Sequence, residues 1–267
     1  MDPKHIIREN FNSIDEMLRI LNTRKNNEIM QNEHSSKQTG DSDWQGTKTY
    51  EEAEELITKG YTEILDEIKS GLKFDATENS KVIPENNVFG YVPNVPNAIM
   101  NLPKSMVYQK RTPKKITTVD LVYCPTANCG TDSKVFVTNG IKILNIINSL
   151  EKNNIRVNLK AALKCSKCGN EYVLVTVTLK GYKEKLNLQK ICFPIAHPSM
   201  LRRFGFKWLE TTPELTCSAW SFGYGTSNVD YSIFDTKEIL LGLNDIRGMT
   251  EEEIIDKILK RTWWGPF

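Results

Sequence analysis

Apolar and polar residues alternate between positions 117 and 180 in a pattern that predicts a strand–helix–strand–strand unit. The first apolar run, 118–123, is followed by a stretch, 141–150, whose Ile and Leu residues recur every three or four positions, as in a helix. Residues 155–159 alternate as a half-buried strand does, and residues 172–179 are rich in β-branched side chains. The order predicts an α/β fold in which helices flank a mixed sheet as a three-layer, Rossmann-like or von Willebrand A-like core.

The N-terminal part of the chain, residues 1–80, is predicted to be an acidic helical region that packs on this core. Residues 25–43 are polar and rich in Asn, Gln, Ser and Asp, which favours a surface loop or a disordered linker. An apolar stripe that includes Ile7, Phe11 and Ile14 fits one face of a helix. Two capping boxes mark helix starts, at Ser13 with Glu16 and at Thr49 with Glu52.

Residues 81–116 are basic and interrupted by prolines. Proline cannot donate a hydrogen bond to a neighbouring strand, so the segment 89–96 is not expected to form a central strand. We predict an extended connector here, leading into an α/β core over residues 117–267. The core is expected to end in a helix that starts at the capping box of Thr250 and Glu253.

Charge is segregated along the chain, although the formal net charge is only +2. Residues 1–80 hold 10 Lys and Arg against 17 Asp and Glu, residues 81–210 hold 20 against 7, and residues 211–267 hold 5 against 9. One interpretation is that the acidic ends fold against the basic middle and neutralise it, or that the charges form a solvated face. The other is that the middle presents a basic surface to nucleic acid or to an acidic protein.

The bulk properties predict a cytoplasmic protein that does not enter a membrane. The 267 residues contain no apolar run of 18 or more, and the charged N-terminus lacks the form of a secretory signal. Thiols are therefore expected to be reduced. Four of the six cysteines are grouped in close pairs, which favours metal binding over disulfides.

The cysteine pairs are the strongest candidate for a site. Cys124 and Cys129 follow the first predicted strand, and Cys165 and Cys168 follow the second. If these strands are parallel neighbours, the pairs end at the same edge of the sheet, and four thiolates can bind one structural Zn²⁺ at about 2.3 Å. Such a site has no open position for catalysis.

Two alternatives to zinc remain open, reduced cysteines in two loops and a redox-active C-x2-C pair. The other two cysteines, Cys192 and Cys217, have apolar neighbours and are expected in the core.

Outside the cysteines the sequence offers a few candidate contact residues and no complete catalytic motif. His197 lies near a pair of arginines that could clamp a phosphate or carboxylate, although a structural histidine and an internal salt bridge are the alternatives. The aromatic C-terminus is expected to pack back or to meet a partner. The candidate ligand or partner contacts are His197, Arg202, Arg203, Lys207, Trp208, Trp263 and Trp264.

Several short stretches resemble an uncharacterised family found in tailed bacteriophages and prophages, which implies a phage origin and brings no activity. The cysteine pairs fall outside the resemblance. The matching stretches are 11–17; 44–46 with Tyr50, 52–53 and 60–61; 90–96 with Pro103 and Met106; Gly140 with 150–151; and 196–204. The core order also looks like a von Willebrand A domain, but residues 124–128 lack the Asp-x-Ser-x-Ser metal motif.

From these patterns we expect a non-enzymatic phage accessory protein, located in the host cytoplasm and braced by zinc. It is expected to bind a protein, such as a host or defence component, through the helical N-terminal region and the aromatic C-terminus. The alternatives are a nucleic-acid-binding protein that uses the basic middle, and an enzyme with a site near His197 and Arg202. Whether it forms an oligomer is left open.

Overall fold

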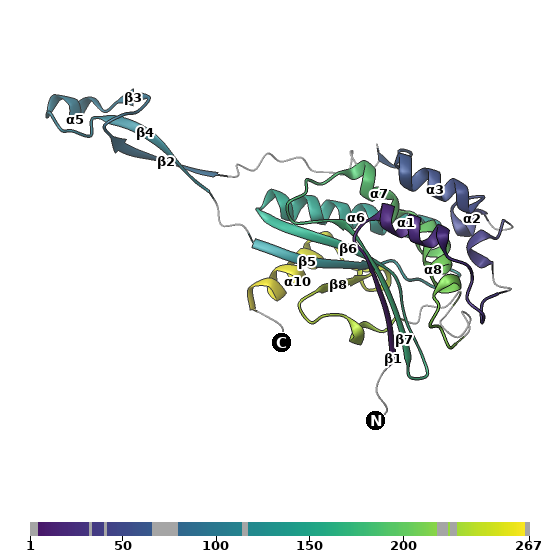
Figure 1. Ribbon diagram of the computed structural model, residues 1–267. Helices are drawn as coiled ribbons and strands as arrows, with labels where there is room; N and C mark the ends of the chain where they lie inside the picture. Colours follow the sequence, from purple (N-terminus) through teal and green to yellow (C-terminus); the bar gives the residue numbers. More distant parts are fainter. Residues whose placement is uncertain are drawn as a thin grey trace.

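The computed structural model describes residues 5–31, 34–39, 42–65, 80–113, 117–217, 224 and 229–264; of residues 80–82, 111–113 and 262–264 it describes only the backbone. Within these ranges the chain forms a five-stranded sheet of order β1-β7-β6-β5-β8 and a three-stranded sheet of order β2-β4-β3 (Figure 1). The strands are β1 (His5–Phe11), β2 (Ser80–Asn87), β3 (Val92–Pro93), β4 (Met106–Pro113), β5 (Thr117–Cys124), β6 (Ile155–Cys168), β7 (Glu171–Lys180) and β8 (Ile239–Gly242).

Helices account for most of the remaining described chain. The α-helices are α1 (Ile14–Thr23), α2 (Ser42–Gln45), α3 (Tyr50–Lys59), α5 (Val95–Ile99), α6 (Ser133–Lys152), α7 (Leu188–Ala196), α8 (Phe206–Thr211), α9 (Leu243–Ile246) and α10 (Glu251–Trp264). A π-helical stretch, η2 (Met200–Gly205), precedes α8, and two short 3₁₀ turns are η1 (Ser35–Lys37) and η3 (Tyr231–Ile233).

The larger sheet confirms the predicted α/β fold, a mixed sheet flanked by helices. Strand β5, helix α6 and strands β6 and β7 follow in the expected order. Strands β5 and β6 are parallel neighbours, with Val119 opposite Val157, whereas β6 and β7 form an antiparallel hairpin. The hairpin turns at Gly169, whose φ of 57° lies in the left-handed region that favours glycine.

All three predicted helix caps are formed. In each, the hydroxyl of the cap residue accepts a hydrogen bond from the backbone N–H three positions later, which satisfies one of the free donors at a helix start. The distances are 3.1 Å for Glu16 N to Ser13 Oγ, 3.1 Å for Glu52 N to Thr49 Oγ1 and 3.2 Å for Glu253 N to Thr250 Oγ1. The glutamate carboxylate accepts the N–H of the cap residue itself at Thr250, and that of the preceding residue, Asn12 or Lys48, at the other two.

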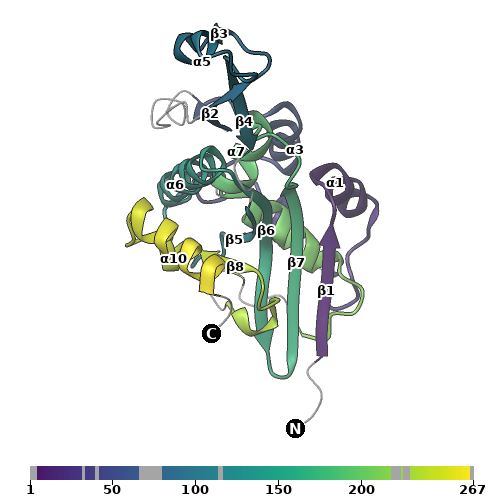
Figure 2. The ribbon, with the colours of Figure 1, turned by 90° about the vertical axis from the view of Figure 1, so that its left-hand side faces the viewer.

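The N-terminus differs from the helical prediction, because residues 5–11 form strand β1. This strand lies parallel to β7, with Phe11 opposite Val177, and occupies the edge of the sheet (Figure 2). Ile7 and Phe11 are buried. Their spacing of four residues fits one face of a helix and one face of a strand equally well, so the apolar pattern alone could not separate the two.

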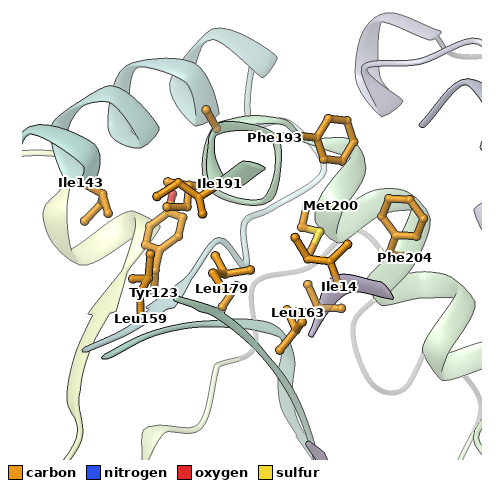
Figure 3. Close-up of a cluster of buried hydrophobic side chains, with 14 of the residues drawn as sticks. Ile14, Tyr123, Ile143, Leu159, Leu163, Leu179, Ile191, Phe193, Met200 and Phe204 are labelled. Carbon is orange, nitrogen blue, oxygen red and sulfur yellow. The ribbon is translucent and has the colours of Figure 1, made fainter. Parts of the chain in front are cut away.

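The main core lies between the sheet and the helices on one face. Side chains such as Leu159 and Leu179 of the sheet pack against Ile143 of α6 and Phe193 of α7 (Figure 3). The opposite face carries a smaller apolar cluster, where Cys124 and Cys165 pack with Phe234. No helix in the described part of the chain is long and apolar enough to cross a membrane.

Helices α6 and α7 approach closely at Gly140. A methyl group on this residue would overlap the Cβ of Ala196 and would lie 2.6 Å from its Cα. We expect Gly140→Ala to destabilise the protein by about 1–3 kcal/mol net, because overpacking outweighs the ~1 kcal/mol that alanine gains in a helix. Urea denaturation measures the change. A Cβ on Gly130 would meet no atom within 4 Å, so Gly130→Ala is the control. Equal stability of the two variants would contradict the prediction.

Candidate functional site

The candidate residues 197–208 lie in the interior, and some of them bind the N-terminal segment 36–47. Arg203 is fully buried on η2. Its guanidinium donates hydrogen bonds to Ser36 O at 2.9 Å, Gln38 O at 2.8 Å and Thr47 O at 2.6 Å, and its Nε to Thr47 Oγ1 at 3.2 Å. The donors of this arginine are therefore directed at residues 36–47 of the same chain rather than at a ligand.

Arg202 is buried in the same way. Its guanidinium donates to Trp44 O and, at 2.8 Å, to Thr131 O. The guanidinium carbon lies 4.4 Å from the centroid of the Trp44 ring and 4.8 Å from that of Phe136, as in cation–π contacts. The paired arginines thus support the packing of α2 and α6 and do not form a clamp on the surface.

The described residues of the polar stretch 25–43, which was expected to form a surface loop or a disordered linker, include a segment that Arg203 and Glu210 anchor. Glu210 accepts hydrogen bonds from Ser36 N at 2.9 Å and Ser36 Oγ at 2.5 Å. Asn27 donates to Leu209 O and Thr212 O at 3.1 and 2.8 Å. Asn27 and Ser36 of this stretch are therefore buried and hydrogen-bonded, whereas most of its other described residues are exposed.

The other candidates near the arginines are also buried. His197 stacks on Phe193 with ring centroids 4.5 Å apart, and its Nδ1 accepts the Ser199 N–H at 3.2 Å. Trp208 donates to Glu9 Oε2 at 2.6 Å, and Lys207 to Asn26 Oδ1 at 3.4 Å. A substrate or a phosphate backbone would have to reach side chains in the interior, so these positions give no support to the enzyme or nucleic-acid alternatives.

The four cysteines of the predicted zinc site do not converge. Strand β6 continues through Cys168, and residues three apart in an extended strand point to opposite faces. Cys165 accordingly packs with Cys124 on one face of the sheet, whereas Cys168 lies against the main core on the other. Cys129 is exposed.

Across the ranges that the structure describes, no group of three or more His, Cys, Asp or Glu is placed to hold a metal ion. Burial raises the pKa of the Cys124 thiol, and with the neighbouring Cys124 it raises that of Cys165. Both effects favour the neutral thiol over the metal-binding thiolate. Zinc binding by these cysteines stays a prediction.

The last candidate for a functional site is the three-stranded sheet of residues 80–113, which we call the arm. The sequence predicted only a connector for these residues. Strands β2 and β4 pair antiparallel, with Glu85 opposite Tyr108, and the short β3 pairs with β4. Asn94 caps α5 by accepting the Asn97 N–H at 3.4 Å. Gly90 lies so close to the backbone of Val107 that no side chain would fit there. Figure 1 shows the arm standing away from the larger sheet.

The arm exposes most of its large apolar side chains. None of the residues 83–110 is buried. Val88 is 69% exposed and Ile99 is 78% exposed, and the rings of Phe89 and Tyr108 pack edge to face with centroids 5.1 Å apart. The exposed large apolar residues of the arm are Ile83, Val88, Phe89, Tyr91, Val92, Val95, Ile99, Met100, Leu102 and Tyr108; outside it, only Ile6 and Ile29 are so exposed among the described residues.

The surfaces that the sequence favoured for a partner are less available. The apolar faces of α1 and α3 are turned into the core, with Met17 and Ala53 fully buried. Trp263 and Trp264 end the backbone of α10, and their side chains lie outside the described residues. A sequence signal for the arm did exist, the apolar residues on both sides of the Gly90 and Asn94 turns, but the prolines favoured a connector.

One comparison with known proteins gives a match. The model of a family described as "Domain of unknown function (DUF7192)" matches residues 2–260. No curated protein and no solved structure matches the chain. The family description does not mention bacteriophages, so the phage resemblance stays a prediction.

We expect Arg203→Met to destabilise the protein by about 3–5 kcal/mol, because it leaves buried carbonyl groups of the 36–47 segment without donors. In this variant, the rate of amide hydrogen exchange in residues 34–39 and 42–47 should rise under conditions in which the rest of the protein stays folded. Chemical denaturation and exchange mass spectrometry measure the two effects. The control is Arg247→Met, since Arg247 is exposed. Unchanged protection of these residues in Arg203→Met would contradict the anchoring role.

His197 gives a pH-dependent prediction. Burial lowers its pKa to about 3. The unfolded chain therefore binds a proton near pH 6.5 that the folded chain does not, and stability falls as the pH decreases below 6.5. Between pH 7 and 5 this histidine should remove about 2 kcal/mol of unfolding free energy. Denaturation curves at both pH values should show a smaller loss in His197→Phe. The same loss in both proteins would refute the assignment.

Proposed function

Because the chain belongs to the DUF7192 family, whose description carries no activity, we propose its function from its surface. We propose that the protein acts by binding another protein through the arm, and not by catalysis. The partner is a protein with an apolar groove bordered by acidic side chains. A cytoplasmic location and a phage origin remain parts of this proposal that rest on the sequence alone.

The proposal is carried by the exposed apolar surface of the arm. A small sheet is stable in water only when it buries an apolar face, and the arm buries none of its side chains from 83 to 110. Large exposed apolar patches mark interaction sites in soluble proteins. A partner that covers Val88, Ile99 and their neighbours would supply the core that the arm lacks.

The chemistry of the patch favours a protein over a nucleic acid. Single strands are bound by aromatic rings that stack on bases and by cations that contact phosphates. Seven of the ten exposed apolar residues of the arm are aliphatic or Met, and these cannot stack on bases in that way. Among the cations of the arm, the Nζ of Lys110 lies 3.6 Å from Oε2 of Glu85, so the charge of Lys110 is partly neutralised within the arm.

The charge of the arm indicates the rim of the partner surface. Residues 80–113 contain four Lys or Arg and one Asp or Glu, so this part of the chain carries a net positive charge. Complementary charge steers association and selects against wrong partners, and it weakens with added salt. An acidic border on the partner groove fits this distribution.

A photo-crosslinking amino acid at position 99 of the full chain, expressed in its source cells, would identify the protein that covers the arm. Binding is then measured with the two purified proteins. We expect Ile99→Asp to weaken binding by about tenfold or more, because a charge replaces a buried apolar contact. Lys104→Glu should weaken it and reduce its salt dependence. The control Ile29→Asp changes an exposed apolar residue outside the arm and should bind as the natural chain does.

Three outcomes would overturn the proposal. Equal losses in Ile99→Asp and Ile29→Asp would show that the arm is not the contact surface. Crosslinks from position 99 to nucleic acid alone, with affinity that falls steeply with salt, would favour the nucleic-acid alternative. If position 99 crosslinks only to a second copy of the chain, and Ile99→Asp dissociates that dimer, then self-association rather than an acidic partner protein covers the arm.

A further inference from the structure

Two cysteines from distant parts of the chain lie together near the tip of the β6–β7 hairpin. Cys168 ends β6, and Cys217 lies in the segment that follows α8. The thiol of Cys168 lies close enough to that of Cys217 to raise the pKa of the Cys217 thiol. Cys217 was expected in the core, but it is only partly buried, as is Cys168.

Contacts of Glu171 fix the backbone on both sides of this pair. Glu171 is the cross-strand neighbour of Cys168. Its Oε2 accepts hydrogen bonds from Thr216 Oγ1 at 2.7 Å and from Thr216 N at 3.3 Å, which holds the residue before Cys217 against the hairpin. Its Oε1 lies 3.1 Å from His5 Nδ1 of strand β1. These contacts hold the backbone segments that carry Cys168 and Cys217 next to each other.

The pair differs from the other cysteines of the chain. Cys124, Cys165 and Cys192 are buried, and Cys192 donates to Tyr61 O at 2.9 Å. Cys129 is exposed. Cys168 and Cys217 combine partial exposure with the proximity of two thiols, which is the arrangement that a small disulfide reagent can convert into an intramolecular disulfide.

We propose that Cys168 and Cys217 form a disulfide bond when the protein meets a low-molecular-weight disulfide such as oxidised glutathione. The thiolate of one cysteine attacks one sulfur of the reagent, forms a mixed disulfide and releases one glutathione thiolate, which takes up a proton. The other cysteine then loses its proton and attacks the sulfur of the first, which releases the second glutathione. Two protein thiols are oxidised, and one glutathione disulfide is reduced to two thiols.

The two thiols act in turn, one attacking the reagent and the other resolving the mixed disulfide. The neighbouring Cys168 thiol, followed by burial, raises the pKa of the Cys217 thiol to about 11, so Cys217 keeps its proton while Cys168 is free. Capture of Cys168 in a mixed disulfide removes the main cause of this shift, so Cys217 can then act as the resolving thiol. The bond would tie the hairpin tip to the chain that follows α8.

The experiment incubates the reduced full chain with a series of ratios of oxidised to reduced glutathione and blocks free thiols with N-ethylmaleimide. Intact mass spectrometry should show two fewer blocked thiols per chain, and peptide mapping should find the linkage between Cys168 and Cys217. The bond closes a long loop, so the Tm should rise by at least about 5 °C. The control Cys129→Ser should form the same bond, because it removes only an exposed cysteine.

Single variants test whether each thiol resolves the mixed disulfide that forms on the other. Cys217→Ser should accumulate one glutathione on Cys168, because no resolving thiol remains. Cys168→Ser should likewise retain one glutathione, on Cys217, because it also lacks a resolving thiol. The proposal is overturned if, after incubation at oxidising ratios, both thiols of the natural chain are still reduced and react with N-ethylmaleimide. It is also overturned if the mapped disulfide joins other cysteines or links two chains.

Discussion

Two buried arginines, hydrogen-bonded to backbone carbonyls, hold the N-terminal and C-terminal parts of the chain together. Burial of a guanidinium is costly unless its donors are satisfied, and Arg203 meets this condition through Ser36, Gln38 and Thr47. Because the fork of donors is rigid, it accepts only one placement of the segment that carries these carbonyls. The N-terminal helices are thereby positioned on the core, and their apolar faces are closed to partners.

The parts of the fold that the sequence predicts are those determined by local patterns. Helical spacing of Ile and Leu predicted α6, and β-branched residues predicted β7, because each pattern matches the period of its element. The helix caps at Ser13, Thr49 and Thr250 were predictable for the same reason, since donor and acceptor lie three residues apart.

The rest depends on contacts that the sequence does not encode locally. The C-x2-C pair of Cys165 and Cys168 was expected to follow its strand, but β6 includes both residues and places their thiols on opposite faces of the sheet. Charge counts overstated the basic surface, because some cations of the middle region are buried. These are Lys164, Lys180, Arg202, Arg203 and Lys207. The arm was missed because its strands pair with each other and bury no side chain between 83 and 110 that would mark a face.

The position of β1 has a consequence for how the chain matures. His5 lies opposite Glu171, so strand β1 has no hydrogen-bonding neighbour until residues 171–177 have left the ribosome. Arg203 emerges later still. Pairing across such sequence separations carries a large loop-closure entropy, which slows folding. The apolar side of the amphipathic helix α1 therefore stays uncovered until β7 and α8, against which it packs, have been synthesised. Chaperone binding at that stage would protect this side from aggregation.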